Sequence, residues 1–212
     1  AGGGSAAMMS FELIDNLLQV AVLGCAAIAA VVLSVRYRDR RCLILAFAYA
    51  SFSMGTLFYV LHLAILGEVP QVFYVSEISW LAAYLFFLSL QILRTEKLPL
   101  RFSWPAAGSA LLFAVCVIVF HIFGPAYLMS ALLAVTVGAA GYLSVFRLGS
   151  GRPFRQTDAC MLACIVLQIL LYVVSDFTRD YTRFGLYFAV DLLLTALLTA
   201  LLPLTLQEVR AS

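Results

Sequence analysis

An acidic residue, an indole and a phenol follow one another at helical spacing near the start of an apolar stretch. Glu77 precedes Trp80 by three residues and Tyr84 by seven, so the three side chains share one face of a helix. A carboxylate beside aromatic rings is suited to holding a cation, through its charge and through cation–π attraction. The spacing therefore predicts a binding surface on this helix.

Polar side chains repeat at helical spacing in three other apolar stretches. Gln168, Tyr172 and Asp176 step by four residues, Tyr187 and Asp191 are four residues apart, and Tyr59 and His62 are three residues apart. We expect these side chains to join the first group in one pocket. The residues predicted to bind a ligand are Tyr59, His62, Glu77, Trp80, Tyr84, Gln168, Tyr172, Asp176 and Asp191.

Simpler roles are open to several members of this set. Tyrosines near helix ends often serve as membrane-interface anchors, His62 could hydrogen-bond a neighbouring helix, and Asp176 could be solvated. Glu77 and Asp191 are the hardest to explain in this way, because an acid inside a membrane helix is a functional candidate by default.

The composition indicates that these residues belong to membrane-spanning helices. The 212-residue chain is 64% hydrophobic and 11% charged, with a mean hydropathy of +1.04, whereas soluble domains are about a quarter charged. Runs of about 20 apolar residues are long enough to cross a bilayer. We predict an all-α polytopic membrane protein with seven transmembrane helices, at 11–35, 42–66, 72–93, 104–123, 126–147, 157–177 and 184–207.

The basic residues predict the direction of these helices. Eleven of the thirteen Lys and Arg residues lie in the first, third and fifth loops and in the C-terminal tail, and only Arg179 and Arg183 lie on the other side. The positive-inside rule then predicts that the N-terminus faces outward and the C-terminus faces the cytoplasm, with the protein in a plasma or inner membrane. The predicted pocket then lies in the outer half, and we expect no acid or base deep in the inner half.

Residues 1–8 resemble a remnant of expression cloning, and residues 9–210 are expected to form one transmembrane domain. No cofactor is expected. Cys160 and Cys164 share a helical face, but two thiols without further ligands make a poor metal site. The net charge of +2 is too small to indicate a nucleic-acid partner.

A weak internal similarity suggests a parallel repeat of three helices, a linker helix and three more helices. Chance matching in a Leu- and Ala-rich sequence is the alternative explanation. Such repeats occur in transporters, whose substrate sites lie between the repeats. The matched pairs, 110, 113 and 114 residues apart, are Ser34 with Ser144, Tyr59 with Tyr172, and Glu77 with Asp191.

The run from Glu77 to Tyr84, with its acid-x-x-Trp-Leu-x-x-Tyr pattern, resembles the third helix of multi-pass bacterial sensor modules. The resemblance extends loosely to the Leu-rich last helix, which ends at Arg210. It implies an input module that binds a small extracellular ligand and acts on a cytoplasmic signalling partner.

Three functions are compatible with these observations. The first is a receptor-like sensor whose ligand, a cation or a hydrogen-bond donor, enters from outside. The second is a small-solute transporter built on the repeat. The third is an intramembrane enzyme, in which His62 with Glu77 or Asp191 holds a metal that His121 can join, or in which the two histidines ligate haem. The pattern favours a protein that is not an enzyme.

Overall fold

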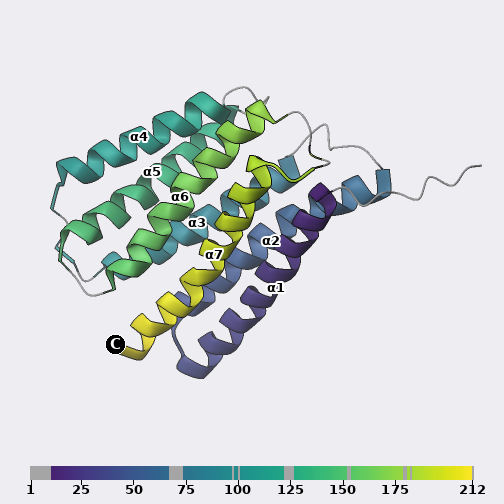
Figure 1. Ribbon diagram of the computed structural model, residues 1–212. Helices are drawn as coiled ribbons and strands as arrows, with labels where there is room; N and C mark the ends of the chain where they lie inside the picture. Colours follow the sequence, from purple (N-terminus) through teal and green to yellow (C-terminus); the bar gives the residue numbers. More distant parts are fainter. Residues whose placement is uncertain are drawn as a thin grey trace, which may run out of the picture.

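The computed structural model describes residues 11–66, 74–96, 98–99, 101–121, 127–151, 154–178, 181 and 183–211, and within these ranges the chain forms seven α-helices (Figure 1). Each predicted run corresponds to one helix, with ends that differ by four residues or fewer, so the all-α, seven-helix prediction is confirmed. Residues 1–8 lie outside the described ranges. The helices are α1 (Phe11–Tyr37), α2 (Arg40–Leu66), α3 (Tyr74–Thr95), α4 (Trp104–His121), α5 (Tyr127–Gly149), α6 (Arg155–Phe177) and α7 (Leu186–Ala211).

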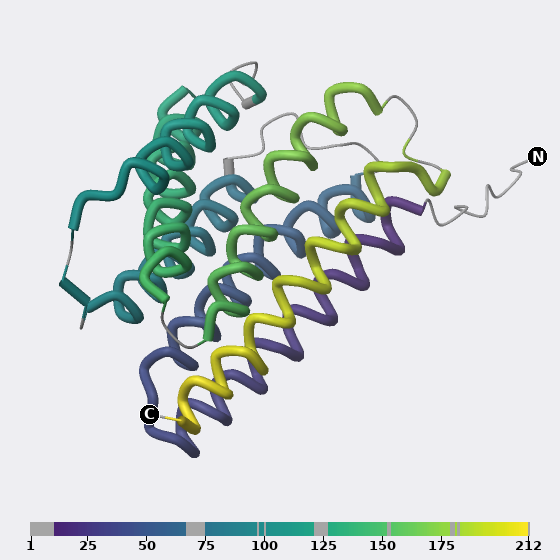
Figure 2. The backbone as a smooth tube through the Cα atoms, turned by 60° about the vertical axis from the view of Figure 1, so that its left-hand side comes forward, coloured from purple at the N-terminus to yellow at the C-terminus, as the bar shows by residue number. Residues whose placement is uncertain are grey.

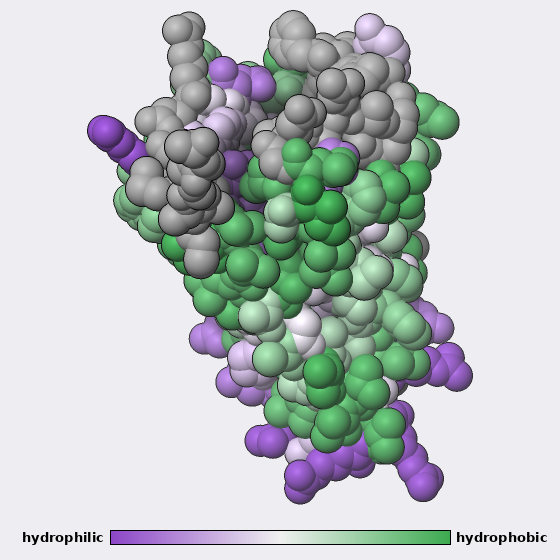
Figure 3. All heavy atoms as spheres, turned by 90° about the vertical axis from the view of Figure 1, so that its right-hand side faces the viewer, coloured by the Kyte–Doolittle hydropathy of each residue, from purple (hydrophilic) through white to green (hydrophobic). Residues whose placement is uncertain are grey.

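Six of these helices are long and apolar enough to cross a membrane. The exception is α4, whose 18 residues extend about 27 Å, slightly less than the ~30 Å hydrocarbon core of a bilayer. Large apolar side chains such as Ile28, Leu111 and Val135 remain exposed, and Figure 3 shows a broad apolar band above a hydrophilic lower edge. The fold is that of a multi-pass membrane protein with six candidate spans and one shorter apolar helix.

The helices form one bundle in which successive helices run in opposite directions. Helix α1 begins at one end of the bundle and helix α7 finishes at the opposite end (Figure 2). We call the end where α1 begins the N-terminal end and the end where α7 finishes the C-terminal end. Helix α1 packs beside α2 and α7, α3 packs beside α2 and α5, and α4 packs on α5 and α6.

The turn between α1 and α2 is built by Arg38 and Asp39. Arg38 adopts a positive φ of 52°, which reverses the chain. Asp39 Oδ1 then accepts the backbone N–H of Arg41 at 2.7 Å and so caps α2, while its carboxylate pairs with the Arg41 guanidinium at 2.8 Å. Burial acts to raise the pKa of Asp39, but the hydrogen bonds from Arg41 outweigh it and lower the pKa below its ordinary value.

Close packing of α2 on α3 positions an aromatic residue of the site. The Ser76 hydroxyl donates to the Gly55 carbonyl at 3.0 Å. A Cβ at Gly55 would lie only 3.0 Å from the Ser76 carbonyl oxygen and from Trp80 Nε1. Glycine therefore permits the approach that brings the Trp80 indole against Thr56, to which its N–H donates at 3.5 Å.

Candidate functional site

A cavity of about 340 Å³ lies among the helices at the N-terminal end of the bundle. Its size falls in the range of small-molecule binding sites. Six aromatic rings, two carboxyl groups and three amide side chains contribute to its walls. The lining residues are Glu12, Asn16, Gln19, Phe52, Tyr59, Trp80, Gln168, Leu171, Tyr172, Ser175, Tyr181, Tyr187 and Asp191.

Five of the nine residues predicted to bind a ligand line this cavity. They come from four helices, α2, α3, α6 and α7, which the helix packing brings together at one depth. The five are Tyr59, Trp80, Gln168, Tyr172 and Asp191.

Glu77 does not line the same cavity. It lies in a smaller neighbouring cavity, and Trp80 and Tyr172 line both. The Glu77 Oε2 atom is buried and has no hydrogen-bond partner among the described residues. The expectation that Glu77 and Asp191 share one cavity is therefore corrected, because the Trp80 and Tyr172 side chains stand between two separate spaces.

Tyr84 lies deeper in the bundle and supports the cavity from below. Its side chain is buried, and its hydroxyl donates to Gln168 Oε1 at 3.0 Å. This hydrogen bond fixes the amide of a residue that lines the cavity. Tyr84 is thus a positioning residue in this structure.

His62 and Asp176 also lie outside the cavity lining. His62 is half-buried on α2 and packs against the Phe58 ring, with ring centroids 6.2 Å apart. Asp176 is exposed at the end of α6. Their spacing with Tyr59 and Tyr172 is helical, but their side chains are rotated away from the shared space.

Gln19 organises the floor of the cavity, and the sequence analysis did not select it. Its amide Nε2 donates to Asp191 Oδ1 and to Thr195 Oγ1, both at 3.0 Å. Its Oε1 accepts the Thr56 hydroxyl at 2.8 Å. One amide thereby links α1, α2 and α7; its spacing of four residues from Asp15 is the pattern that could have drawn attention to it.

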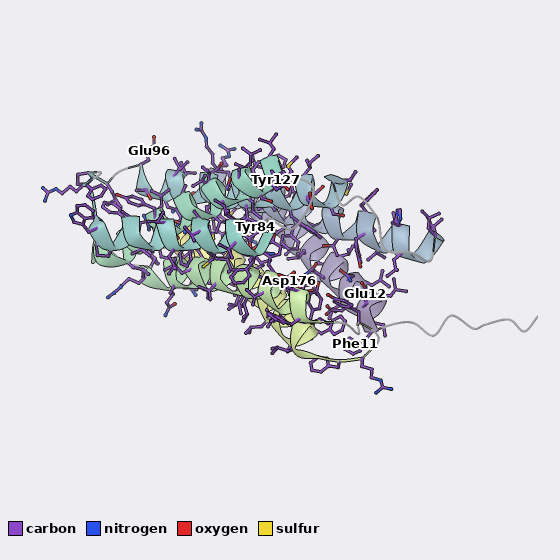
Figure 4. All side chains as sticks on the ribbon, turned by 90° about the horizontal axis from the view of Figure 1, so that it is seen from above. Phe11, Glu12, Tyr84, Glu96, Tyr127 and Asp176 are labelled. Atoms are coloured by element: carbon purple, nitrogen blue, oxygen red, sulfur yellow. The ribbon has the colours of Figure 1, made fainter. Side chains whose placement is uncertain are left out.

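Acidic and aromatic groups surround the mouth of the cavity. The Tyr59 hydroxyl donates to the Glu12 carboxylate. Burial, followed by the negative charges of Glu12 and Asp176, raises the pKa of Tyr181 above its ordinary value, which keeps this phenol a neutral donor. Figure 4 shows Phe11 and Glu12 close together near the beginning of α1, with Glu96 at the far end of the bundle and Tyr84 between them.

A second polar cluster closes the C-terminal end. Arg94 pairs with Asp158 at 2.6 Å and with Glu208 at 2.5 Å, and Arg147 pairs with Asp158 at 3.1 Å. The guanidinium of Arg147 also donates to the Arg94 carbonyl. These four side chains are at most 8% exposed and join α3, α5, α6 and α7.

The sequence analysis counts Arg94 and Arg147 among the loop charges. In the structure each lies in the last turn of a helix and is buried, because two arginines and two acids neutralise one another and can be buried together.

The described residues provide no group of three or more His, Cys, Asp or Glu side chains that could hold a metal ion. The side chain of His121 lies outside the described part of the structure. The hypothesis of a metal- or haem-dependent enzyme therefore gains no support from these residues.

The chain was also compared with known proteins. No family model, no curated protein and no solved structure matches it.

Proposed function

We propose that this protein is a receptor-like membrane module that binds a small organic cation in the cavity at its N-terminal end. The observation that carries the proposal is the chemistry of the cavity walls. Aromatic rings and carboxyl groups line a cavity of about 340 Å³, and no Lys, Arg or His side chain is among the lining residues that the structure describes.

This lining favours a cation such as a substituted ammonium group. The faces of Trp and Tyr attract cations, and the attraction strengthens when water is excluded. Glu12 supplies a carboxylate near the mouth, while the Gln168 amide and the tyrosine hydroxyls can bond the polar part of a ligand. An anion would meet repulsion from the carboxylates with no compensating base.

The same helices carry the cavity and the ionic cluster, which supports a role in signal transmission. Helix α3 bears Trp80 at the cavity and Arg94 in the cluster, about 21 Å apart along the helix. Helix α7 bears Asp191 and Glu208, about 26 Å apart. A small shift of either helix on ligand binding would strain the ionic cluster, because buried ion pairs are favourable only when their geometry is good.

The distribution of basic residues supports an orientation for the two ends of the bundle. Most Lys and Arg residues lie in or beside the connections at the C-terminal end. We therefore expect that end to face the cytoplasm, across a plasma or inner membrane, and the cavity to face outward. All seven helices cross in this arrangement, α4 included. A cytoplasmic signalling partner would then contact the C-terminal end, where the ionic cluster lies.

A small-solute transporter is the second candidate, and one observation favours it. In a parallel repeat, α1, α2 and α3 correspond to α5, α6 and α7. The contact of α1 with α7 then corresponds to a contact of α5 with α3, and the structure contains both contacts. This is the arrangement that a parallel three-helix repeat requires. In a transporter the ionic cluster would be a closed inner gate. Uptake of a labelled ammonium compound into proteoliposomes, absent with empty liposomes, would establish this alternative.

Matched probes test the receptor proposal directly. Choline and tetramethylammonium are compared with uncharged analogues in which carbon replaces the quaternary nitrogen, using purified protein in lipid nanodiscs. Trp80 fluorescence reports occupancy once the exposed Trp104 is replaced by Phe. We expect the ammonium probes to change the fluorescence and raise the melting temperature, and the uncharged analogues to do neither.

Substitutions then locate the contact. Glu12→Gln should weaken ammonium binding by about 1–4 kcal/mol, the Coulomb attraction of two unit charges ~4 Å apart at effective dielectric constants of about 80 to 20. Asp176→Asn, which changes an exposed acid outside the cavity, should leave binding unchanged, and Glu77→Gln tests the neighbouring cavity. Equal binding of charged and uncharged probes, or failure of every ammonium probe, would refute the proposal.

A further inference from the structure

Two carboxyl groups meet at the floor of the cavity, beside Gln19. Asp15 belongs to α1 and Asp191 to α7, and they are 4% and 5% exposed. Their side chains lie within hydrogen-bonding reach of each other. An ionised carboxylate only accepts hydrogen bonds, so a bond between two carboxyl groups requires a proton on one of them.

The partners of each oxygen show where this proton is needed. Asp191 Oδ1 already accepts the Gln19 amide, whose own oxygen is held by Thr56. Asp15 Oδ2 is buried and has no hydrogen-bond partner among the described residues. The carboxyl group of Asp15 is therefore a nearly fully buried polar group turned towards Asp191 with a bonding position unfilled.

No positive charge in the described structure neutralises this pair. Neither carboxyl group is paired with a Lys, Arg or His side chain there. Two carboxylates side by side in an apolar site cannot both stay ionised without a proton or another cation. Arg179 and Asp180 lie outside the described residues. The other titratable groups around the pair are one acid and three phenols: Glu12 on α1, Tyr59 on α2, Tyr187 on α7, and Tyr181 in the loop before α7.

We infer that Asp15 and Asp191 form a proton-binding site that joins α1 to α7. One proton is shared between the two carboxyl groups in the bound state. Release leaves two carboxylates and transfers the proton to water in the cavity, which Asp191 lines; no electrons move. Because like charges then face each other, release favours separation of α1 from α7. The inference needs no ligand in the cavity and stands apart from the receptor proposal.

Infrared spectroscopy tests the site without any added ligand. In lipid nanodiscs at neutral pH, the carbonyl stretching region of the infrared spectrum should contain a band from a protonated carboxyl group. Asp15→Asn and Asp191→Asn should each abolish this band, because the asparagine amide donates its own N–H to the remaining carboxylate. Asp176→Asn, at an exposed acid of the same end, should leave the band unchanged.

Several results would overturn the inference. The first is the absence of a protonated carboxyl band from the unsubstituted protein. The second is a band that survives in both Asp15→Asn and Asp191→Asn. A band that appears only when sodium is removed would show a sodium site instead. A band that appears only after Arg179→Gln would show that this arginine neutralises the pair.

The pH dependence of unfolding gives an independent measurement. At neutral pH the folded protein holds one proton that the unfolded chain lacks, so stability falls as pH rises. One proton corresponds to a tenfold change in the folding equilibrium constant for each pH unit. In Asp191→Asn this contribution should vanish. Identical slopes for the two proteins, with both folded, would contradict the shared proton.

Discussion

Replacing Arg94 by glutamine removes the cation that bonds to both acids of the C-terminal cluster. The side chains of Arg94, Asp158 and Glu208 are 1%, 3% and 5% exposed, so water cannot compensate for the loss. Arg147 still pairs with Asp158, and the unpaired charge therefore falls mainly on Glu208. Removing one partner of a buried ion pair costs about 3–5 kcal/mol, a large share of the ~5–15 kcal/mol by which proteins are stable.

Unfolding by SDS of the purified protein in mixed micelles measures this cost. Arg94→Gln should lower the free energy of unfolding by about 3–5 kcal/mol. Arg94→Gln combined with Glu208→Gln restores neutrality and should recover part of the loss, with a coupling of about 0.5–3 kcal/mol.

Arg101 provides the matched control. It is exposed, and Arg101→Gln should change stability by no more than about 0.5 kcal/mol. If Arg94→Gln costs no more than Arg101→Gln, or if the added Glu208→Gln deepens the loss, the cluster does not hold the helices together as described.

Three further predictions concern other parts of the molecule. Tyr84→Phe leaves the buried Gln168 Oε1 without its donor and should cost about 1–3 kcal/mol in the same unfolding assay; no loss would remove Tyr84 from its positioning role. Asp39→Ala removes the cap on α2 and the contacts to Arg41, which should cost about 0.5–2 kcal/mol. The pKa of Asp39 is lowered in the folded protein. The stabilisation by Asp39 is therefore fully present at pH values above the ordinary pKa of aspartate, and it is lost as the pH falls through the pKa of Asp39 in the folded protein. The stability difference between the two proteins should therefore close in acid, as pH-dependent unfolding will show. Ser150→Cys should react with a membrane-impermeant thiol reagent only from the cytoplasmic side; reaction from outside would reverse the orientation and place the cavity in the cytoplasm.

Most of the fold could be predicted because membrane helices have a simple composition. Long apolar runs must satisfy their backbone polar groups internally, which makes each run a helix. The end of the last helix was harder. The predicted end at residue 207 stops just before Glu208, since a charge signals water, yet α7 continues to Ala211. Glu208 is buried there because Arg94, 114 residues earlier, neutralises it.

The site was predictable only in part, because spacing reports periodicity within one helix and not the rotation of that helix against its neighbours. Tyr59, Trp80 and Asp191 line the cavity as their spacing suggested. Glu77 is one turn from Trp80 and still opens into a different space. The role of Gln19 was not predictable from its four-residue spacing to Asp15, because its partner Asp191 lies 172 residues away in the sequence.

The ionic cluster also has a consequence for how the chain is made. Its members leave the ribosome in the order Arg94, Arg147, Asp158 and Glu208, and chains fold from the N-terminal side during synthesis. Before α7 is added, two arginines face one acid, so the growing bundle holds an uncompensated positive charge that is costly to bury. Arrival of Glu208 on α7 completes the neutral set. We therefore expect a chain interrupted within the last helix to be less stable, and so more readily degraded, than the complete bundle.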